Sequence, residues 1–345
     1  MYNANYSSIV NPTILPFIDI YANSLAFMAL KFGVQIEPQF GFDYETVKKI
    51  TLEAEKLGYH ALWVSDHFFL DDKSEEKNCM EAWTLLGALA SVTSKIRLGT
   101  LVSCQSYRYP AVLAKIASTV DLISEGRLEF GIGAGWKEVE YNAYGINFPP
   151  IKERMDQLEE YIQIVKALWT KPKATFEGKH YKVKEAFSAP KPVQKLPPIF
   201  IGGSGKKRTM SMVAKYGDYI NLPFTPLDQV SDILDALKQH CDKFDRDYDE
   251  IGKSYFTQMF VAETEDEVEK YLVEMANRFD IPLDKLKERL KKSAGPGAWA
   301  GTPEKVIERL QYLIDLGFDY FHLMFPYSKD LELTKNFEKL IMRKI

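Results

Sequence analysis

The chain has few cysteines and no excess of positive charge. It contains three cysteines in 345 residues, Cys79, Cys104 and Cys241, and no two of them form a Cys-X-X-Cys pair. This argues against a disulfide framework and a zinc site and favours a reducing cytoplasm. With 44 Lys and Arg against 48 Asp and Glu, the formal net charge is −4. That balance argues against nucleic acid or an anionic membrane as the main partner.

The first 27 residues contain no lysine and no arginine. A signal peptide needs a basic start and an uninterrupted apolar segment, whereas Pro12 and Pro16 interrupt this stretch. The stretch is also too broken to span a membrane. A second methionine, Met28, follows it. We therefore expect residues 1–27 to form a disordered extension, or to follow an upstream start codon, and the fold to occupy residues 28–345.

From residue 30 onward, segments typical of strands and helices alternate. Expected strands are Lys31–Ile36, Ala61–Ser65, Ile96–Ser103, Arg127–Gly133, Ile199–Ile201, Asp218–Leu222, Ser254–Ala262 and Asp319–Met324. The segment at about 170–198 breaks this rhythm with five prolines and an alternating stretch, which indicates an inserted hairpin. About eight right-handed βα units specify a closed parallel barrel. The sequence thus predicts the α/β class: a single (β/α)8 TIM barrel with a hairpin inserted after its fourth helix, Lys152–Trp169.

Four strand ends carry residues suited to a site, because the carboxyl ends of barrel strands converge on one face. They are Ser65–His67, Thr100–Cys104, Gly131–Trp136 and Ile201–Arg208.

His67 combines the functional end of a strand with an acidic neighbour, Asp66. An imidazole with its ordinary pKa of ~6.5 can give or take a proton at neutral pH. The alternative is a loop histidine that simply pairs with Asp66. His322 is expected in the core, and a metal site is not expected, because no second histidine or cysteine cluster has ligand spacing.

Two glycine-rich loops each allow two interpretations. Gly202–Gly205 is expected to open a helix and hold a phosphate on its backbone N–H groups, with Lys206, Lys207 and Arg208 adding positive charge. The alternative is an ordinary strand-to-helix turn. The glycines of Gly131–Gly135 either let a flat ring approach the backbone or pack against Trp136.

Together, these strand ends resemble the luciferase-like flavin and deazaflavin oxidoreductase superfamily, over about residues 31–324. The motifs that carry the resemblance are Trp63-Val-Ser-Asp-His-Phe, Ile96-Arg-Leu-Gly-Thr, Tyr107-Arg-Tyr-Pro-Ala, Gly126-Arg-Leu-Glu-Phe-Gly-Ile-Gly-Ala-Gly-Trp, Pro198-Ile-Phe-Ile-Gly-Gly-Ser-Gly and Gly301-Thr-Pro-Glu-Lys-Val. The Asp-His pair is most similar to the branch that uses coenzyme F420.

The resemblance implies roles for particular residues. Val102 and Ser103 would form a strand bulge behind a deazaflavin ring, often with a non-proline cis peptide. Ala134 and Gly135 would lie along the ring or its ribityl chain, and Gly202, Gly203 and Ser204 would hold phosphate. Asp66 would hold the cofactor and orient His67, which would exchange a proton as hydride moves.

The resemblance also implies an oxidoreductase that transfers hydride between coenzyme F420 and a small organic substrate. The alternatives are an FMN-dependent monooxygenase and a non-catalytic flavin-binding barrel. Trp136 stands where the F420-linked sugar-phosphate dehydrogenases carry a glutamate, which argues against sugar-phosphate oxidation and for an apolar substrate. Members of this superfamily commonly form dimers, so we expect a homodimer.

Overall fold

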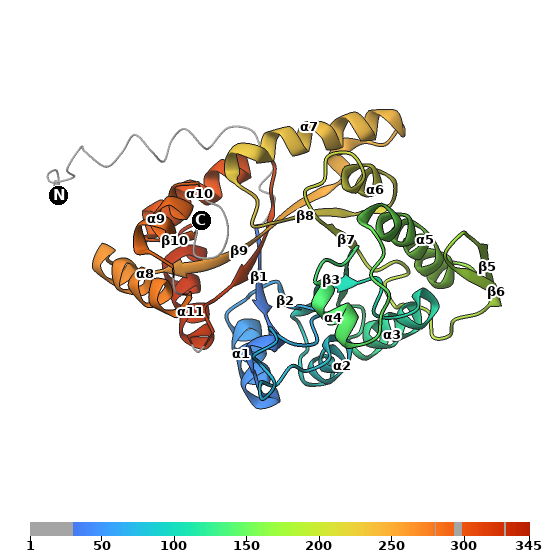
Figure 1. Ribbon diagram of the computed structural model, residues 1–345, viewed down its shortest axis with the longest axis horizontal. Coiled ribbons are helices and arrows are strands. Elements are labelled where there is room, and N and C mark those ends of the chain that lie inside the picture. Colours follow the sequence, from blue (N-terminus) through green and yellow to red (C-terminus); the bar gives the residue numbers. More distant parts are fainter. Residues whose placement is uncertain (1–29, 280, 293–298, 328) are drawn as a thin grey trace, which may run out of the picture. The chain divides into compact units, whose positions relative to one another are not determined.

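Eight parallel strands close into a barrel (Figure 1). The computed structural model describes residues 30–279, 281–292, 299–327 and 329–345, so the expected extension, residues 1–27, lies outside the described residues. Around the barrel the order is β1 (Lys31–Ile36), β2 (Ala61–Val64), β3 (Arg97–Cys104), β4 (Leu128–Gly133), β7 (Ile199–Gly202), β8 (Tyr219–Pro223), β9 (Gly252–Val261) and β11 (Tyr320–Met324). Pairing of β11 with β1 completes the ring, which confirms the expected TIM barrel.

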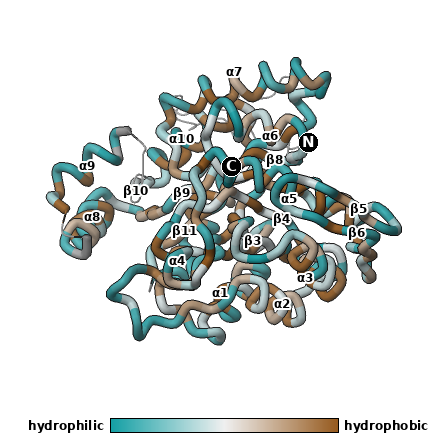
Figure 2. Tube along the Cα trace, turned by 45° about the vertical axis from the view of Figure 1, so that its right-hand side comes forward, coloured by the Kyte–Doolittle hydropathy of each residue, from teal (hydrophilic) through white to brown (hydrophobic). Residues whose placement is uncertain are grey.

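Helices occupy the connections between strands. They are α1 (Tyr44–Lys56), α2 (Ala82–Val92), α3 (Pro110–Ile123), α4 (Glu138–Ala143), α5 (Ile151–Thr170), α6 (Thr209–Tyr216), α7 (Leu227–Lys243), α8 (Glu265–Phe279), α9 (Leu283–Lys292), α10 (Pro303–Asp315) and α11 (Asp330–Phe337). Figure 2 shows hydrophilic residues recurring along outer helices such as α7 and α9. Within the described residues, no helix has both the length and the apolar character needed to cross a membrane.

The local sequence explains where several helices begin and why one short helix is not predicted from the sequence. The Asp43 carboxylate accepts the Thr46 N–H at 2.7 Å and caps α1, while Pro110 occupies the first position of α3. The six-residue α4 is too short to show a helical period, so the sequence did not predict it. A short strand, β10 (Trp299–Gly301), pairs with β9 outside the ring and was also missed.

The expected insertion is an antiparallel hairpin of β5 (Ala174–Glu177) and β6 (Lys182–Ala186), after α5. Glu160 on α5 anchors its turn by accepting the backbone N–H groups of Lys179, His180 and Tyr181 at 2.8–2.9 Å. At the other side, the Tyr181 hydroxyl donates to the Gln105 side chain at 2.8 Å. The hairpin is therefore fixed both to α5 and to the loop that follows β3.

The indole of Trp63 fills much of the barrel interior. A Cβ at Gly33 would lie 2.8 Å from the indole, and a Cβ at Gly99 would lie 2.5 Å from it. Because these two glycines have no side chains, the space beside them is free for the indole. Trp63 packs edge-to-face on Phe200 at 4.9 Å between ring centroids, and its Nε1–H donates to the Tyr320 hydroxyl at 3.2 Å. The lumen is thus a packed core.

His322 lies in the same interior, as the sequence predicted. Its side chain is fully buried, and its ring packs edge-to-face on Trp63 at 4.8 Å. Neither ring nitrogen has a hydrogen-bond partner among the described residues. Desolvation, together with the nearby His60, holds the pKa of His322 well below its ordinary value. The imidazole is therefore a neutral core side chain.

Filling the space that Gly99 leaves should destabilise the barrel. In Gly99→Ala the added Cβ would lie 2.5 Å from both the Glu129 carbonyl oxygen and the Trp63 ring, and the backbone oxygen cannot rotate away. We expect a loss of about 1–3 kcal/mol in the free energy of unfolding, measured with urea. Gly87→Ala in α2 is the control, since among the described residues no atom outside the adjoining turns of its own helix lies within 4 Å of its Cβ position. Equal stability of the two variants would contradict this packing.

Candidate active site

The four strand ends that the sequence singled out are neighbours, because β2, β3, β4 and β7 are adjacent in the sheet. Val64 pairs with Thr100, Cys104 with Gly133, and Ile132 with Ile201. The loops that leave these strands therefore lie side by side at the carboxyl face of the barrel.

His67 lies at this face and contacts a carboxylate from α4, the helix that follows β4. Its Nδ1 lies 2.9 Å from Oε2 of Glu140, and its side chain is 19% exposed. The Trp136 ring, 72% exposed, meets the imidazole edge-on at 5.6 Å between centroids. The histidine thus has a fixed orientation, partial solvent access and an aromatic neighbour.

Glu140 sits on α4, and its side chain is fully buried. Oε1 accepts the Phe68 N–H at 2.7 Å and the Phe69 N–H at 3.2 Å, and Oε2 accepts the Tyr107 hydroxyl at 2.6 Å. Burial opposes ionisation, but the hydrogen bonds from His67, Tyr107 and the backbone outweigh it and lower the pKa of Glu140 to about 2. The carboxylate is therefore ionised at neutral pH.

Asp66 does not orient His67, so this expectation is wrong. Its carboxylate forms a bidentate pair with Arg108, at 2.7 and 2.8 Å, and accepts the Cys104 N–H at 3.0 Å. Arg108 also contacts Glu81. Burial opposes the charge on Arg108, but Asp66 and Glu81 outweigh it and raise the pKa of the guanidinium. Asp66 therefore ties the β2 end to the loop after β3.

The bulge that the resemblance implied at Val102 and Ser103 is present. The register between β3 and β4 shifts between Thr100 and Ser103, and the Leu101–Val102 peptide is cis. Ser103 is fully buried, and its Oγ accepts the Trp83 Nε1–H at 3.0 Å, so its side chain is turned into the protein. Val102 is half-buried.

Neighbouring side chains explain the glycines at this face. A Cβ at Gly133 would lie 2.8 Å from a Val102 methyl, and one at Gly202 would lie 3.1 Å from Val102. Gly135, with φ +77°, would place a Cβ 1.9 Å from the Tyr141 hydroxyl. The atoms nearest to the Cβ positions of Gly133 and Gly202 therefore belong to Val102, and the atom nearest to that of Gly135 belongs to Tyr141.

The loop after β7 differs from the expected helix start. Helix α6 begins at Thr209, so Gly202–Gly205 does not open it directly. Gly203, with φ +131°, donates its N–H to the Asn221 carbonyl at 3.0 Å. Ser204 is exposed, while Gly202 and Gly203 are half-buried.

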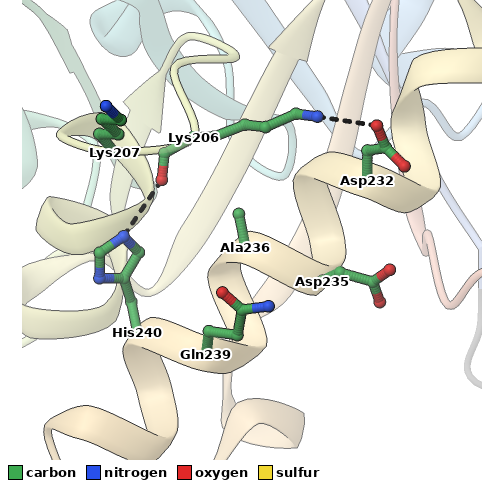
Figure 3. A pocket seen from close by; sticks show the side chains of 7 residues that line it. All are labelled: Lys206, Lys207, Asp232, Asp235, Ala236, Gln239 and His240. Atoms are coloured by element: carbon green, nitrogen blue, oxygen red, sulfur yellow. Dashed lines mark hydrogen bonds and ion pairs between the residues drawn. The ribbon is translucent and has the colours of Figure 1, made fainter.

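Acidic partners neutralise part of the expected positive charge. Lys206 pairs with Asp232 at 2.8 Å, and Arg208 pairs with Asp156. Figure 3 shows an open depression between this loop and α7, with the Lys206–Asp232 pair at one side and Lys207 pointing away from α7. The charge available to a phosphate is therefore smaller than the sequence indicated.

Other groups at this face do not offer a nucleophile or a metal site. Cys104 contacts the Tyr141 hydroxyl at 2.9 Å, and burial raises the pKa of its thiol to about 12. Among the described residues, no group of three or more His, Cys, Asp and Glu is arranged to hold a metal ion.

Comparison with known sequences assigns most of the chain to one family. Residues 26–320 match the profile of the family described as luciferase-like monooxygenase. The F420-dependent glucose-6-phosphate dehydrogenase of Microbacterium testaceum is 28% identical over 298 residues, which are 79% of this chain and 84% of that protein. An uncharacterized protein of Mycobacterium bovis is 31% identical over 180 residues, 48% of this chain and 63% of that protein, so less than two thirds of that relative is matched.

Solved structures show the same fold at low identity. An F420-dependent secondary alcohol dehydrogenase, in complex with an F420–acetone adduct, has a TM-score of 0.74 at 19% identity and covers 91% of this chain and 98% of its own. The oxygenating constituent of 3,6-diketocamphane monooxygenase from Pseudomonas putida, in complex with FMN, has a TM-score of 0.72 at 17% identity, with 92% and 99% covered.

Removing the arginine that pairs with Asp66 should destabilise the protein. In Arg108→Met the Asp66 carboxylate stays buried without its bidentate partner, and such losses cost about 3–5 kcal/mol. We expect a drop of this size in the free energy of unfolding in urea, and partial recovery in the double variant Asp66→Asn, Arg108→Met. Lys182→Met, which breaks an exposed pair with Glu177, should leave stability unchanged. If the urea midpoint of Arg108→Met equals that of the wild type, the Asp66–Arg108 pair does not contribute to stability.

Proposed function

The chain belongs to the luciferase-like monooxygenase family, and from this we propose that it transfers a hydride between coenzyme F420 and a small organic substrate. The observation that carries the proposal is His67, half-buried at the carboxyl face of the barrel with its Nδ1 on an ionised carboxylate. Such an imidazole can exchange a proton at its other nitrogen, as an alcohol–carbonyl interconversion requires.

The residues at this face fit a flat ring that carries a phosphate. Half-buried Val102 supplies an apolar surface on the bulge, while Ser103 can offer only its backbone. Ala134 and Gly135 would lie along the ring or ribityl chain, and Gly202, Gly203 and Ser204 would hold the phosphate through backbone and hydroxyl groups. Asp66, occupied by Arg108, would act on the cofactor through the loop that it fixes. When bound, F420 supplies hydride chemistry at C5 of its deazaflavin ring.

Trp136 favours an apolar substrate. The indole is exposed beside His67, so a substrate that reaches the imidazole also meets an aromatic surface. A sugar phosphate would gain little from this surface. We therefore propose a small apolar alcohol or carbonyl compound as the substrate class.

An FMN-dependent monooxygenase is the second candidate, because FMN is also a flat ring with a phosphate and one monooxygenase of the same fold is in complex with FMN. A non-catalytic flavin-binding barrel is a third. The homodimer and the cytoplasmic location stay predictions, which light scattering and cell fractionation would test. Exposed Val112, Leu122 and Ile123 on α3 offer apolar area that a second copy would bury.

Titration of the purified protein with each reduced cofactor tests the choice of F420. We expect saturable binding of F420, followed by fluorescence, and weaker binding of FMN. A deazaflavin core without phosphate should bind more weakly than F420 if Gly202, Gly203 and Ser204 hold that group. Tight FMN binding with no response to F420 would replace the proposal by the monooxygenase.

Removal of the His67 imidazole should cut turnover without unfolding the protein. General acid–base catalysis contributes about 10²–10⁴-fold, so His67→Ala should lower kcat by that range, measured by F420 absorbance with the best substrate of an apolar alcohol panel. Circular dichroism should stay unchanged. His60→Asn is the control, since His60 pairs with Glu129 and precedes β2 at the amino end of the barrel. Wild-type turnover in His67→Ala would remove the proposed role.

A further inference from the structure

The two oxygens of Glu140 have separate tasks. Oε1 accepts the backbone N–H groups of Phe68 and Phe69 and lies 3.2 Å from the Lys137 ammonium, so it fixes the turn after His67. Within the part of the chain that the structure describes, both hydrogen-bond partners of Oε2 are side-chain groups, namely Nδ1 of His67 at 2.9 Å and the Tyr107 hydroxyl at 2.6 Å. The structural anchor and the contact with the imidazole therefore use different atoms of one carboxylate.

We propose that Glu140 is a positioning residue that fixes the Nδ1–H tautomer of His67 and stabilises its imidazolium, and that Tyr107 weakens this effect by donating to the same oxygen. The inference rests on the proposed function, since it assigns to His67 the proton exchanged with substrate. It adds two residues, contributed by α4 and by the loop after β3, that the sequence did not connect with the histidine.

The tautomer follows from hydrogen-bond chemistry. An ionised carboxylate is an acceptor only, so Nδ1 must carry the hydrogen that joins it to Oε2. The neutral ring then keeps its lone pair on Nε2, which is the nitrogen free to take a proton. When Nε2 is protonated, the adjacent carboxylate stabilises the positive ring.

The Tyr107 hydroxyl competes for the same negative charge. Burial, with the neighbouring Cys104 and Glu140, raises the pKa of Tyr107, so the phenol keeps its hydrogen and donates it to Oε2. Each donor withdraws electron density from the oxygen, and a second donor makes it a weaker acceptor for Nδ1. Loss of the hydroxyl should strengthen the bond to His67, whereas loss of the carboxylate charge should remove it.

The remaining charged and titratable groups near the pair come from several elements. They include Lys137 at the N-cap of α4, Cys79 in the loop before α2, Glu37 after β1, Cys104 and Tyr141 beside Tyr107, and the Asp66–Arg108 pair between the ends of β2 and β3. Burial raises the pKa of Cys79 to about 12, so this thiol is neutral. With the Glu140 charge removed, the Lys137 cation would disfavour an imidazolium at His67.

The test compares Glu140→Gln and Tyr107→Phe by NMR of the cofactor-free protein. Long-range ¹H–¹⁵N spectra report the tautomer, and comparison with His67→Ala assigns the ring signals. We expect the Nδ1–H form in the wild type. The pH at which the ring takes up its second proton should fall by about one unit or more in Glu140→Gln and should rise in Tyr107→Phe.

Turnover should follow the same order. The pH at which kcat/KM falls on the acidic side should move down in Glu140→Gln and up in Tyr107→Phe, and kcat should drop at least tenfold in Glu140→Gln with little change in cofactor KM. Glu55→Gln is the matched control, because the Glu55 carboxylate, like that of Glu140, accepts backbone N–H groups, which here come from Ser94, Lys95 and Ile96. It should leave the His67 signals unchanged.

The two variants are expected to shift the protonation of His67 in opposite directions. This distinguishes a positioning role of Glu140 from a purely structural one. Shifts in the same direction, or an Nδ1–H tautomer with unchanged titration in Glu140→Gln, would overturn the inference. Tyr107→Phe keeps its ring stacked on Phe68 and decides the matter if Glu140→Gln does not fold, since an unchanged titration there would also overturn it. The expected spectra without any F420 turnover would support the positioning and overturn only the proposed function.

Discussion

The geometry of this protein depends on how eight short strands close around one indole. Trp63 occupies the part of the lumen that Gly33 and Gly99, which have no side chains, leave free, and its indole packs there against the neighbouring strands. In this sheet β2, β3, β4 and β7 pair with one another in that order, so their carboxyl ends lie side by side at one face. The order of the strands in the barrel therefore determines which side chains meet at its carboxyl face.

The inserted hairpin takes part in the architecture of that face. Tyr181 bonds to Gln105, and the Tyr109 hydroxyl donates to the Lys182 carbonyl at 2.7 Å, so the insertion grips the loop after β3 at two points. The same loop carries Arg108, which holds Asp66, and Tyr107, which holds Glu140. A segment that looks like an addition to the barrel thus helps to set the environment of the histidine.

The sequence predicted the barrel because alternating strands and helices have local signals, and it predicted the bulge at Val102 through resemblance. It did not predict the partner of His67. Glu140 lies 73 residues away on a helix of six residues, which is too short for a hydrophobic period. The sequence pointed instead to Asp66 as the partner of His67, because the two residues are adjacent. In the structure the Asp66 carboxylate binds Arg108, 42 residues away. Pairings of this kind depend on which loops the closed barrel brings together, and no local pattern encodes them.

The buried His322 limits the acidity that the fold can tolerate. His322 is neutral when folded, because burial and the nearby His60 disfavour a charge on its ring and no acceptor among the described residues stabilises one. Once the chain unfolds, the same imidazole takes up a proton below its ordinary pKa of ~6.5, so the unfolded state binds more protons there. Lowering the pH therefore shifts the folding equilibrium toward the unfolded state through His322. His322, which lies in the barrel interior, thus makes the stability of the whole fold sensitive to acid. The loss of stability begins just below neutral pH.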